Sequence, residues 1–205
     1  MQINYQHLLI FGLVMIPVWF LFIYFWPSLL LSVYKRGILV NGFGDGPIPV
    51  NTLSTEPQAL FADPIHPPAS ASKLATTGVN RDTLLTVGWL DLSKGPLVLH
   101  VPDMAGRYYS VQFTDPSNNT NFAYVGTRAT GTQAGDYLIT GRGWKGQVPS
   151  GMRQISSPNK SVLVIGRVLV ESDSDLSTAY DLSKQIQLTP LSGWQPGRKH
   201  INTDM

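Results

Sequence analysis

One apolar segment constrains this chain more than any other feature of its sequence. Residues 8–34 contain no ionisable side chain apart from tyrosines. A transmembrane helix needs about 20 mainly apolar residues to cross a hydrocarbon core roughly 30 Å thick, so this segment is long enough to span a bilayer even when it is tilted. Pro17 lies near its middle and predicts a kink, which a membrane helix tolerates. We therefore expect a single N-terminal transmembrane anchor over residues 1–36.

Large aromatic side chains concentrate in the second half of this segment, namely Trp19, Phe22, Tyr24, Phe25 and Trp26. Helices in lipid associate through shape packing and a few polar contacts, because lipid tails are as apolar as the helices themselves. These rings are therefore expected to pack the helix against other subunits of a membrane assembly. Anchoring in lipid, which aromatic residues also favour, is the alternative.

A cleaved signal peptide is the other interpretation of this segment. A signal peptide would have a shorter apolar region, a basic residue before it and a small-residue cleavage site soon after it, and the sequence has none of these. Lys35 and Arg36 follow the segment directly, and the positive-inside rule read literally would keep the rest of the chain in the cytoplasm. Two charges are a weak signal, since large domains cross membranes largely regardless of charge.

Composition excludes several kinds of site and partner. The chain has no cysteine, which removes disulfides, thiol catalysis, iron–sulfur clusters and covalent c-type haem. The net charge of +2 comes entirely from Lys35 and Arg36, because the other basic and acidic residues balance. A neutral domain has no electrostatic footprint for nucleic acid. We expect no nucleic-acid partner.

The rest of the chain is predicted to be mainly β. Residues 37–77 are rich in Gly and Pro and predict an extended segment, of which apolar residues such as Ile48 pack against the fold. From residue 78 apolar and polar residues alternate with a period of two, as in half-buried strands. Strands are expected over residues 84–89, 96–102, 107–115, 122–126, 136–141, 153–156 and 162–170.

Short strands separated by turn signals are typical of an antiparallel β-sandwich or a jelly-roll-like domain. Residues 172–188 predict one C-terminal helix, and residues 192–205 a polar tail, so that the folded domain covers residues 78–191. The inward positions of the strands predict a core that includes Trp89, Tyr109, Val111 and Phe113.

Catalytic motifs are weak in this sequence. The four histidines, His7, His66, His100 and His200, lack metal-ligand spacing, so no metal or cofactor is expected. His100 lies on a predicted strand, where a half-exposed histidine is favoured over a catalytic base. The run GRGWKG at 141–146 matches a dinucleotide-binding pattern, but the QVPSG that follows cannot open the required helix, so a glycine-rich hairpin turn is expected. No serine-nucleophile motif is present, and no catalytic residue is assigned.

The polar residues that are candidates for binding a ligand or a partner lie at the ends of predicted strands: Asn80, Arg81, Asp82, Arg107, Tyr108, Asp115 and Arg128. Arginines in such a group can bind a carboxylate or phosphate with two parallel hydrogen bonds. In the alternative, which we favour, the arginines pair with Asp82, Asp103 or Asp115 and serve only to stabilise strand ends.

Several ordered motifs carry a family resemblance: NRDTL, WLDLSKGPLVLHVPD, GRYYSVQF and YVGTRATGTQAGDYLI, followed by GRVLV and LTPLSGW. With these motifs the chain resembles the bacterial domain of unknown function 1254 family over about residues 75–195. The resemblance implies a mostly β, envelope-associated domain, here in a short membrane-anchored form that lacks a companion domain, number 1214. It supplies no reaction and no catalytic residues.

Two functions from different classes are therefore expected. The first is a single-pass accessory or structural subunit of the inner membrane, whose periplasmic β domain binds a larger membrane complex or a companion chain. The second is an envelope enzyme or small-molecule binding protein that uses the Arg/Tyr/Asp group.

Overall fold

The computed structural model describes residues 5–44, 46–58 and 82–195 of the chain. Contacts divide the chain into two compact units, Met1–Arg36 and Gly37–Met205, and each is considered by itself. The second unit holds all the strands, in agreement with the mainly β fold expected from the sequence.

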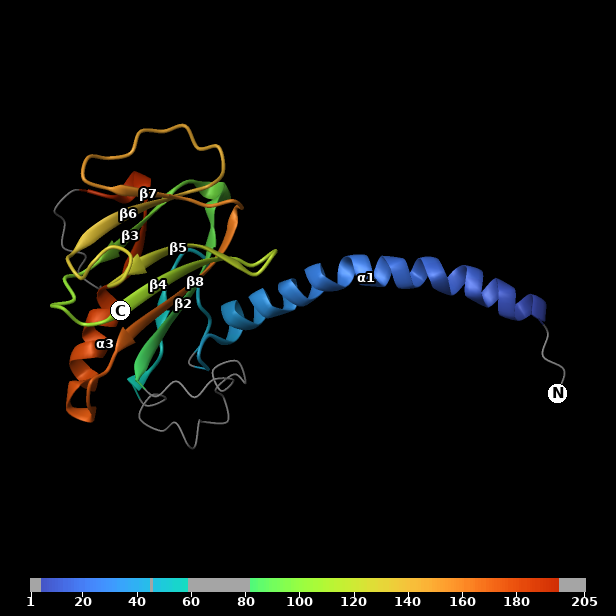
Figure 1. Cartoon of the computed structure of the whole chain (residues 1–205), viewed down its shortest axis with the longest axis horizontal. Helices are drawn as coiled ribbons and strands as arrows, with labels where there is room; N and C mark the ends of the chain where they lie inside the picture. Colours follow the sequence, from blue (N-terminus) through green and yellow to red (C-terminus); the bar gives the residue numbers. More distant parts are fainter. Residues whose placement is uncertain (1–4, 45, 59–81, 196–205) are drawn as a thin grey trace. The chain divides into compact units, whose positions relative to one another are not determined.

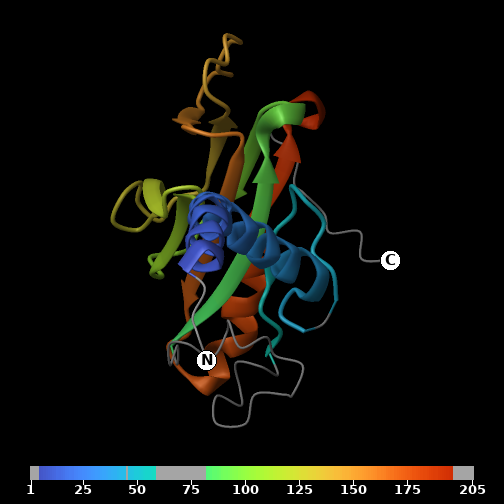
Figure 2. The same ribbon diagram turned by 90° about the vertical axis from the view of Figure 1, so that its right-hand side faces the viewer.

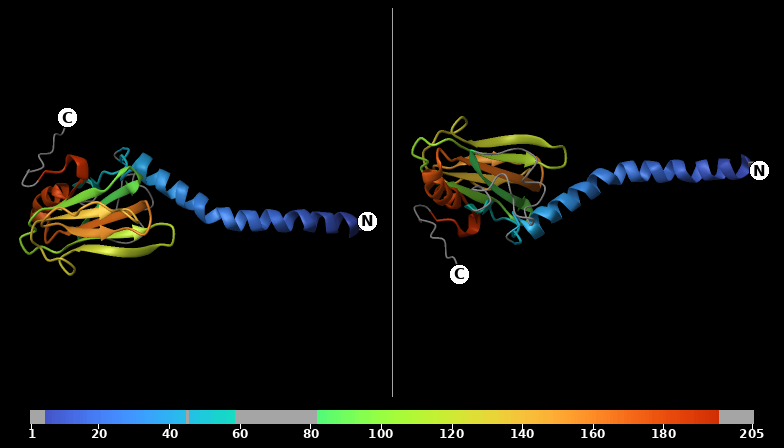
Figure 3. Two further views of the ribbon diagram at one scale, coloured as in Figure 1. Left: turned by 90° about the horizontal axis from the view of Figure 1, so that it is seen from above. Right: turned by 90° about the horizontal axis from the view of Figure 1, so that it is seen from below.

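The first unit consists of the long helix α1, Tyr5–Asn41, which continues into the second unit. The helix includes both Pro17 and Pro27 without interruption, and it is not straight (Figure 3). Its stretch Phe11–Asn41 is long and apolar enough to cross a membrane, by length and composition alone. The helix ends beyond the expected residue 36, where Gly42 takes the left-handed conformation (φ 53°) and its N–H donates to the Ile38 carbonyl.

Two sheets form the β domain, and the order of strands in each is established by hydrogen bonding (Figure 1). The five-stranded sheet has the order β1 (Ser54–Thr55), β2 (Thr83–Asp91), β8 (Ser161–Leu169), β4 (Tyr109–Asp115), β5 (Thr120–Gly126). The four-stranded sheet has the order β7 (Arg153–Ser156), β6 (Gly135–Thr140), β3 (Leu97–Val101), β9 (Gln187–Pro190). Figure 3 shows the strands in two layers, the expected sandwich.

Alternate residues of both sheets form one continuous apolar core, because side chains along a strand point to opposite faces. Tyr109, Val111 and Phe113 of β4 are completely buried in it, as the alternation predicted. Trp89 is also completely buried, but it points to the opposite face of the sheet from Leu90, and its indole Nε1 donates to the Ser161 hydroxyl at 2.7 Å.

One helix packs beside the five-stranded sheet. α3 (Leu176–Gln185; Figure 1) contacts β1, β2 and β8 and buries Ala179 in the core, while Ser177, Thr178 and Asp181 are exposed. Three short 3₁₀ turns complete the fold, at Leu92–Lys94, Asp173–Asp175 and Leu191–Gly193.

The structure corrects three expectations about the elements. The C-terminal helix ends at Gln185 instead of near residue 188, because the following residues form β9 and pair with β3. The connection over residues 141–152, at the end of the domain in Figures 1 and 2, is not a hairpin, since β6 and β7 are parallel. The Gly/Pro-rich segment 37–77 is not extended from its first residue, because α1 runs on to Asn41; its packing is confirmed by the buried Ile48 and by β1, which pairs with β2.

Candidate functional site

The candidate site is a hollow of about 500 Å³ on the outer face of the five-stranded sheet, the face that points away from the core; we call it the outer-face pocket. Its polar lining comes from three adjacent strands and the turn after β5: Tyr108, Ser110, Gln112, Tyr124, Arg128 and Arg167. The strand alternation explains this lining, because Ser110 and Gln112 point outward where Tyr109, Val111 and Phe113 point into the core.

Strand register places Arg167 at the centre of this face. Arg167 lies directly opposite Ser110 of β4 on one side and Leu85 of β2 on the other. Ser110 in turn lies opposite Gly126, and Gln112 lies opposite Tyr124. The consecutive strands β4 and β5 and the distant strand β8 therefore bring one hydroxyl, one phenol ring and one cation to the same part of the sheet.

Gly126 forms a part of the pocket lining where β5 approaches β4 closely. A Cβ atom at this position would come within 2.5 Å of the Tyr109 carbonyl oxygen and 2.8 Å of the Ser110 Cα. Both are backbone atoms that cannot move aside cheaply, so only glycine fits. The absence of a side chain at Gly126 leaves this part of the sheet surface uncovered.

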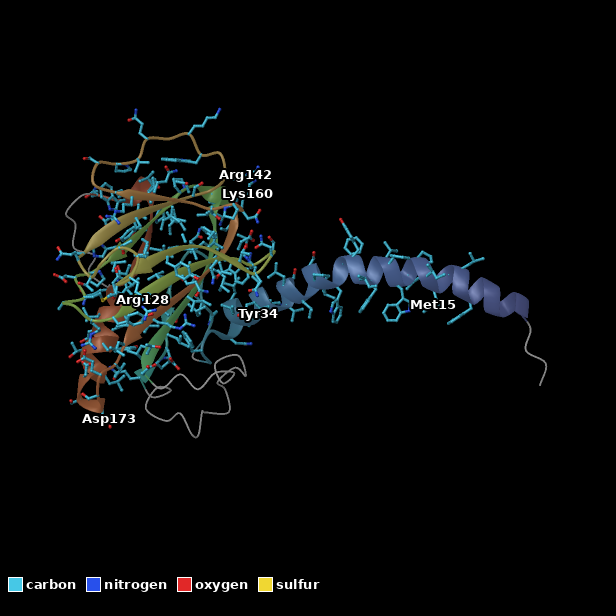
Figure 4. The ribbon with its side chains drawn as sticks, in the orientation of Figure 1. Met15, Tyr34, Arg128, Arg142, Lys160 and Asp173 are labelled. Carbon is cyan, nitrogen blue, oxygen red and sulfur yellow. The ribbon has the colours of Figure 1, made fainter. Side chains whose placement is uncertain are left out.

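Arg128 and Tyr108 form the rim of the pocket. The guanidinium carbon of Arg128 lies 5.7 Å from the centroid of the Tyr108 ring, within the range of a cation–π contact. Figure 4 marks Arg128 on the β domain, with its side chain exposed. The ring holds the guanidinium without neutralising its charge.

The lining of the pocket carries no acidic side chain. Within the described parts of the chain, neither Arg128 nor Arg167 has an ion pair. Arg128 is exposed and Arg167 is half-buried on the central strand of the sheet. The outer-face pocket is therefore electropositive, although the domain as a whole is neutral.

Arg107, a member of the group expected from the sequence, lies outside this pocket. Its Nη2 donates to Asp175 Oδ1 at 2.6 Å, and its Nη1 donates to Asp175 Oδ2 and, at 2.7 Å, to the Leu169 carbonyl. The hydrogen bonds from Arg107 lower the pKa of the Asp175 carboxyl, and the same bonds raise the pKa of Arg107. Arg107 is thus a structural residue, but its partner is Asp175 instead of Asp82, Asp103 or Asp115.

Asp115 also has a structural role. This carboxylate is 1% exposed, and it accepts hydrogen bonds from the Ser117 backbone and hydroxyl at 3.0 and 2.6 Å and from Asn159 Nδ2 at 2.6 Å. It joins the β4–β5 turn to the β7–β8 turn. Asp82 is exposed and leads into β2, whereas Asn80 and Arg81 lie outside the described residues. Of the five candidates that the structure describes, only Tyr108 and Arg128 meet, so these five do not form one site.

His100 belongs to a second polar group, which the sequence did not indicate. Its Nδ1 lies 2.7 Å from Asp136 Oδ1 on the neighbouring strand β6, and Trp194 Nε1 donates to the other oxygen of the same carboxylate at 3.2 Å. The side chains of His100 and Asp136 are 31% and 27% exposed. His100 is a half-exposed strand histidine as expected, with Asp136 to orient its ring.

Metal and nucleotide sites find little support in the described residues. The part of the chain that the structure covers holds no group of three His, Asp or Glu side chains that could bind a metal. The GRGWKG run lies in the 141–152 connection, where a turn closes from the Trp144 N–H to the Gly141 carbonyl, and no helix begins there. The run is therefore not followed by the helix that the dinucleotide pattern requires, as the QVPSG after it predicted.

Sequence analysis missed Arg167 and Tyr124 as partners of Tyr108 and Arg128. A signal was present, since Arg167 is the only charged residue in the apolar strand VLVIGRVLV. Period-two alternation alone cannot say which residues of other strands lie beside it. That information comes from strand pairing, which joins residues more than fifty positions apart.

Comparisons with known proteins bear on the fold. The crystal structure of the VPA0106 protein from Vibrio parahaemolyticus superposes with a TM-score of 0.60 at 23% identity, over 89% of this chain and 41% of that chain. A putative uncharacterized protein from Burkholderia cenocepacia gives a TM-score of 0.37 at 10% identity, over 58% of this chain and 31% of that one. No curated protein matches. The chain thus spans less than half the length of either solved protein.

The family model described as protein of unknown function (DUF1254) matches residues 63–190, which is more than half of the chain and includes strands β2 to β9. This chain belongs to the DUF1254 family.

Proposed function

We propose that this protein is a single-pass, membrane-anchored accessory subunit whose α1 recognises another subunit of a membrane protein complex and whose β domain lies in the periplasm. The observation that carries the proposal is a stripe of aromatic rings along α1. We call Trp19, Phe22 and Trp26 the aromatic stripe.

The three rings of the aromatic stripe contact one another in sequence along the helix. The Trp19 and Phe22 centroids are 5.7 Å apart with the rings nearly perpendicular, and the Phe22 and Trp26 centroids are 4.8 Å apart with the rings tilted by 32°. Spacings of three and four residues place side chains on one face of a helix. The stripe is therefore a pre-assembled surface, with 42–56% of each ring residue exposed.

The depth of these rings favours a protein neighbour over the lipid interface. With a rise of about 1.5 Å per residue, Trp26 lies about 14 Å and Phe22 about 20 Å from Lys35 along the helix axis. A hydrocarbon core of roughly 30 Å that ends near Lys35 has its midplane at about 15 Å. Tryptophan favours the membrane interfaces, where its N–H meets water, so an indole near the midplane gains more from packing against another helix.

The partner that fits this surface is an apolar transmembrane helix of a different protein. Large rings hold a facing helix at a distance, whereas close self-association uses small residues four positions apart. Ser28 and Ser32 have that spacing, but the Ser32 hydroxyl already donates to the Ser28 carbonyl at 2.8 Å. The rings of the aromatic stripe would therefore pack into a complementary groove on the surface of the partner helix.

A stripe variant with a matched control tests this proposal. Trp19→Leu/Phe22→Leu/Trp26→Leu should retain membrane insertion, measured by resistance to carbonate extraction, and should lose the partner chains that co-purify with the native protein in mild detergent. Tyr24→Leu/Phe25→Leu removes a ring pair outside the stripe, with centroids 5.0 Å apart, and should keep those chains.

Three results would contradict the proposal. The native protein could be recovered alone or only as a homodimer, or the stripe variant could retain every partner. In the last case α1 is a passive tether, and recognition lies in the β domain. The outer-face pocket favours a second function, ligand binding, which does not depend on α1.

A further inference from the structure

We propose that the outer-face pocket binds a small organic anion: one oxyanion group, a carboxylate or a phosphate, carried on an apolar or aromatic body. Arg167 and Arg128 would bind the oxyanion, and Tyr108 and Tyr124 would contact the body. This inference does not rest on the accessory-subunit proposal, because every residue in it belongs to the β domain.

The position of Arg167 is the first argument. A half-buried guanidinium on the central strand loses part of its hydration, and an unpaired charge in such a place is costly. Its neighbours across the strands are Leu85 and Ser110, which supply no negative charge. Arg107, which is half-buried like Arg167, is by contrast paired on both of its terminal nitrogens with Asp175. An anionic ligand would give Arg167 the partner that the described chain does not.

The second argument is the convergence of two cations on one hollow without an acidic residue. Arg128 reaches the pocket from the turn after β5, whereas Arg167 comes from β8. Planar guanidinium groups present paired N–H donors that match the two oxygens of a carboxylate or phosphate. Ser110, opposite Arg167 on β4, adds a hydroxyl to the lining, and Gly126 adds no side chain to it.

The third argument concerns the body of the ligand. The ring of Tyr108 already lies under Arg128, and Tyr124 is 49% exposed on the strand next to β4. Exposed phenol rings offer faces for stacking as well as a hydroxyl that donates or accepts. A hollow of about 500 Å³ lies within the usual range for small-molecule pockets and exceeds what a bare phosphate needs. An anion with an apolar body therefore fits better than an inorganic ion.

Titration of the full chain in a non-ionic detergent tests the proposal, with phenyl phosphate and benzoate as probes and isothermal calorimetry as the readout. At least one probe should bind, and Arg167→Gln and Arg128→Gln should each weaken its binding about tenfold or more, because each removes a charge-assisted contact. Arg153→Gln is the matched control, since Arg153 is an exposed arginine on β7 of the other sheet and should leave binding unchanged. Phenol, which lacks the oxyanion, should bind at least about tenfold more weakly.

Inorganic phosphate and dihexanoyl phosphatidylglycerol complete the experiment. Inorganic phosphate should bind more weakly than phenyl phosphate, and equal affinity would overturn the assigned apolar body. If the phosphatidylglycerol binds more tightly than phenyl phosphate and benzoate, and Arg167→Gln abolishes this binding, the oxyanion is that of a lipid headgroup. If phenyl phosphate or benzoate binds more tightly than the phosphatidylglycerol, the ligand is a free small molecule. The proposal would be overturned if no anion binds with a Kd below about 10 mM, or if both arginine variants retain binding.

Circular dichroism of each variant separates lost binding from lost folding. Both arginines are on the outer face, and neither contributes to the apolar core. The variants should therefore melt within a few degrees of the native protein. If Arg167→Gln unfolds, Arg128→Gln on the exposed turn carries the test, and unchanged binding in that variant would overturn the assignment.

Discussion

Arg107 and Asp175 form a bidentate ion pair that joins three elements of the sandwich. Arg107 precedes β4, Asp175 precedes α3, and the same guanidinium donates to the Leu169 carbonyl at the end of β8 at 2.7 Å. Asp175 Oδ2 also accepts from the Glu171 N–H at 3.0 Å. Both side chains are mostly covered, with 12% and 17% exposed. The pair therefore holds the turn between β8 and α3 against the start of β4.

Arg107→Ala should lower the free energy of unfolding by about 2–3 kcal/mol, because it leaves a covered carboxylate and a carbonyl without their donor. Urea unfolding of the full chain in detergent, followed by circular dichroism, measures this loss. Lys184→Ala is the control: its 3.5 Å pair with the exposed Asp181 and its contact with the Tyr180 ring at 4.6 Å are both near the surface, so their loss should cost at most about 1 kcal/mol. An equal decrease in the free energy of unfolding in the two variants would show that the Arg107–Asp175 pair stabilises the fold no more than a surface ion pair does.

The same pair predicts how stability depends on pH. The hydrogen bonds from Arg107 and from the Glu171 N–H lower the pKa of Asp175 in the folded protein. A lowered folded pKa means that this contribution is fully present above the unfolded value of about 3.9 and is lost as the pH falls through the folded value. The stability difference between the native protein and Asp175→Asn should therefore be constant between about pH 5 and pH 8 and shrink below about pH 4. A difference that instead grows in acid would reverse the sign and contradict the assignment.

Phe113→Ala tests the strand phase of β4. Phe113 is completely buried, and its ring lies 6.2 Å from that of Phe122 on β5. Loss of a large core ring leaves a cavity and should destabilise the fold by roughly 3–5 kcal/mol. Gln112→Ala, one residue away on the outer face, should cost much less in the same urea titration. A loss below about 1 kcal/mol for Phe113→Ala would mean that the ring is not in the core.

Gly88→Ala tests whether the segment before β1 packs on β2. A Cβ at Gly88 would lie 2.4 Å from the Thr52 carbonyl oxygen and 2.6 Å from a methyl carbon of Leu53. This contact forces either the backbone or β1 to shift, so a loss above about 2 kcal/mol is expected. Gly141→Ala, whose Cβ would make ordinary contacts of 3.6 Å or more, is the control. If Gly88→Ala melts like the native protein, the 52–53 segment does not rest on β2.

A reporter fusion tests the proposed periplasmic placement of the β domain. Alkaline phosphatase fused after Met205 should be active, because this enzyme needs the oxidising periplasm to form its disulfides. A fluorescent protein that matures only in the cytoplasm, fused at the same residue, should be dark. The opposite pair of results would place the domain in the cytoplasm, where Lys35 and Arg36 alone would put it.

Local pattern was sufficient for elements whose residues are neighbours in the chain. The apolar run of α1 indicated a long helix, whose large apolar side chains are mostly exposed. The alternation around Tyr109, Val111 and Phe113 indicated which side chains are buried, since strand geometry determines which side chains share a face. Seven of the nine described strands, β2 to β8, were therefore found close to their observed bounds. β1 was missed because two residues show no alternation, and β9 was missed because its first residues, Gln187 and Leu188, were assigned to the preceding helix.

Long-range pairing decided what the sequence could not. Alternation predicts that Ser110 and Arg167 each point away from a core, but their position opposite each other depends on β8 inserting between β2 and β4. Tertiary contacts also gave Arg107 and Asp115 their own partners, Asp175 and Asn159, whereas Tyr108 and Arg128 line the outer-face pocket, although all four stand at strand ends in the sequence. The sequence alone determined a membrane-competent helix and a β domain with alternating faces. Only the tertiary structure decided which polar residues meet, because strand order and register are set by the packing of the whole core, to which every strand contributes.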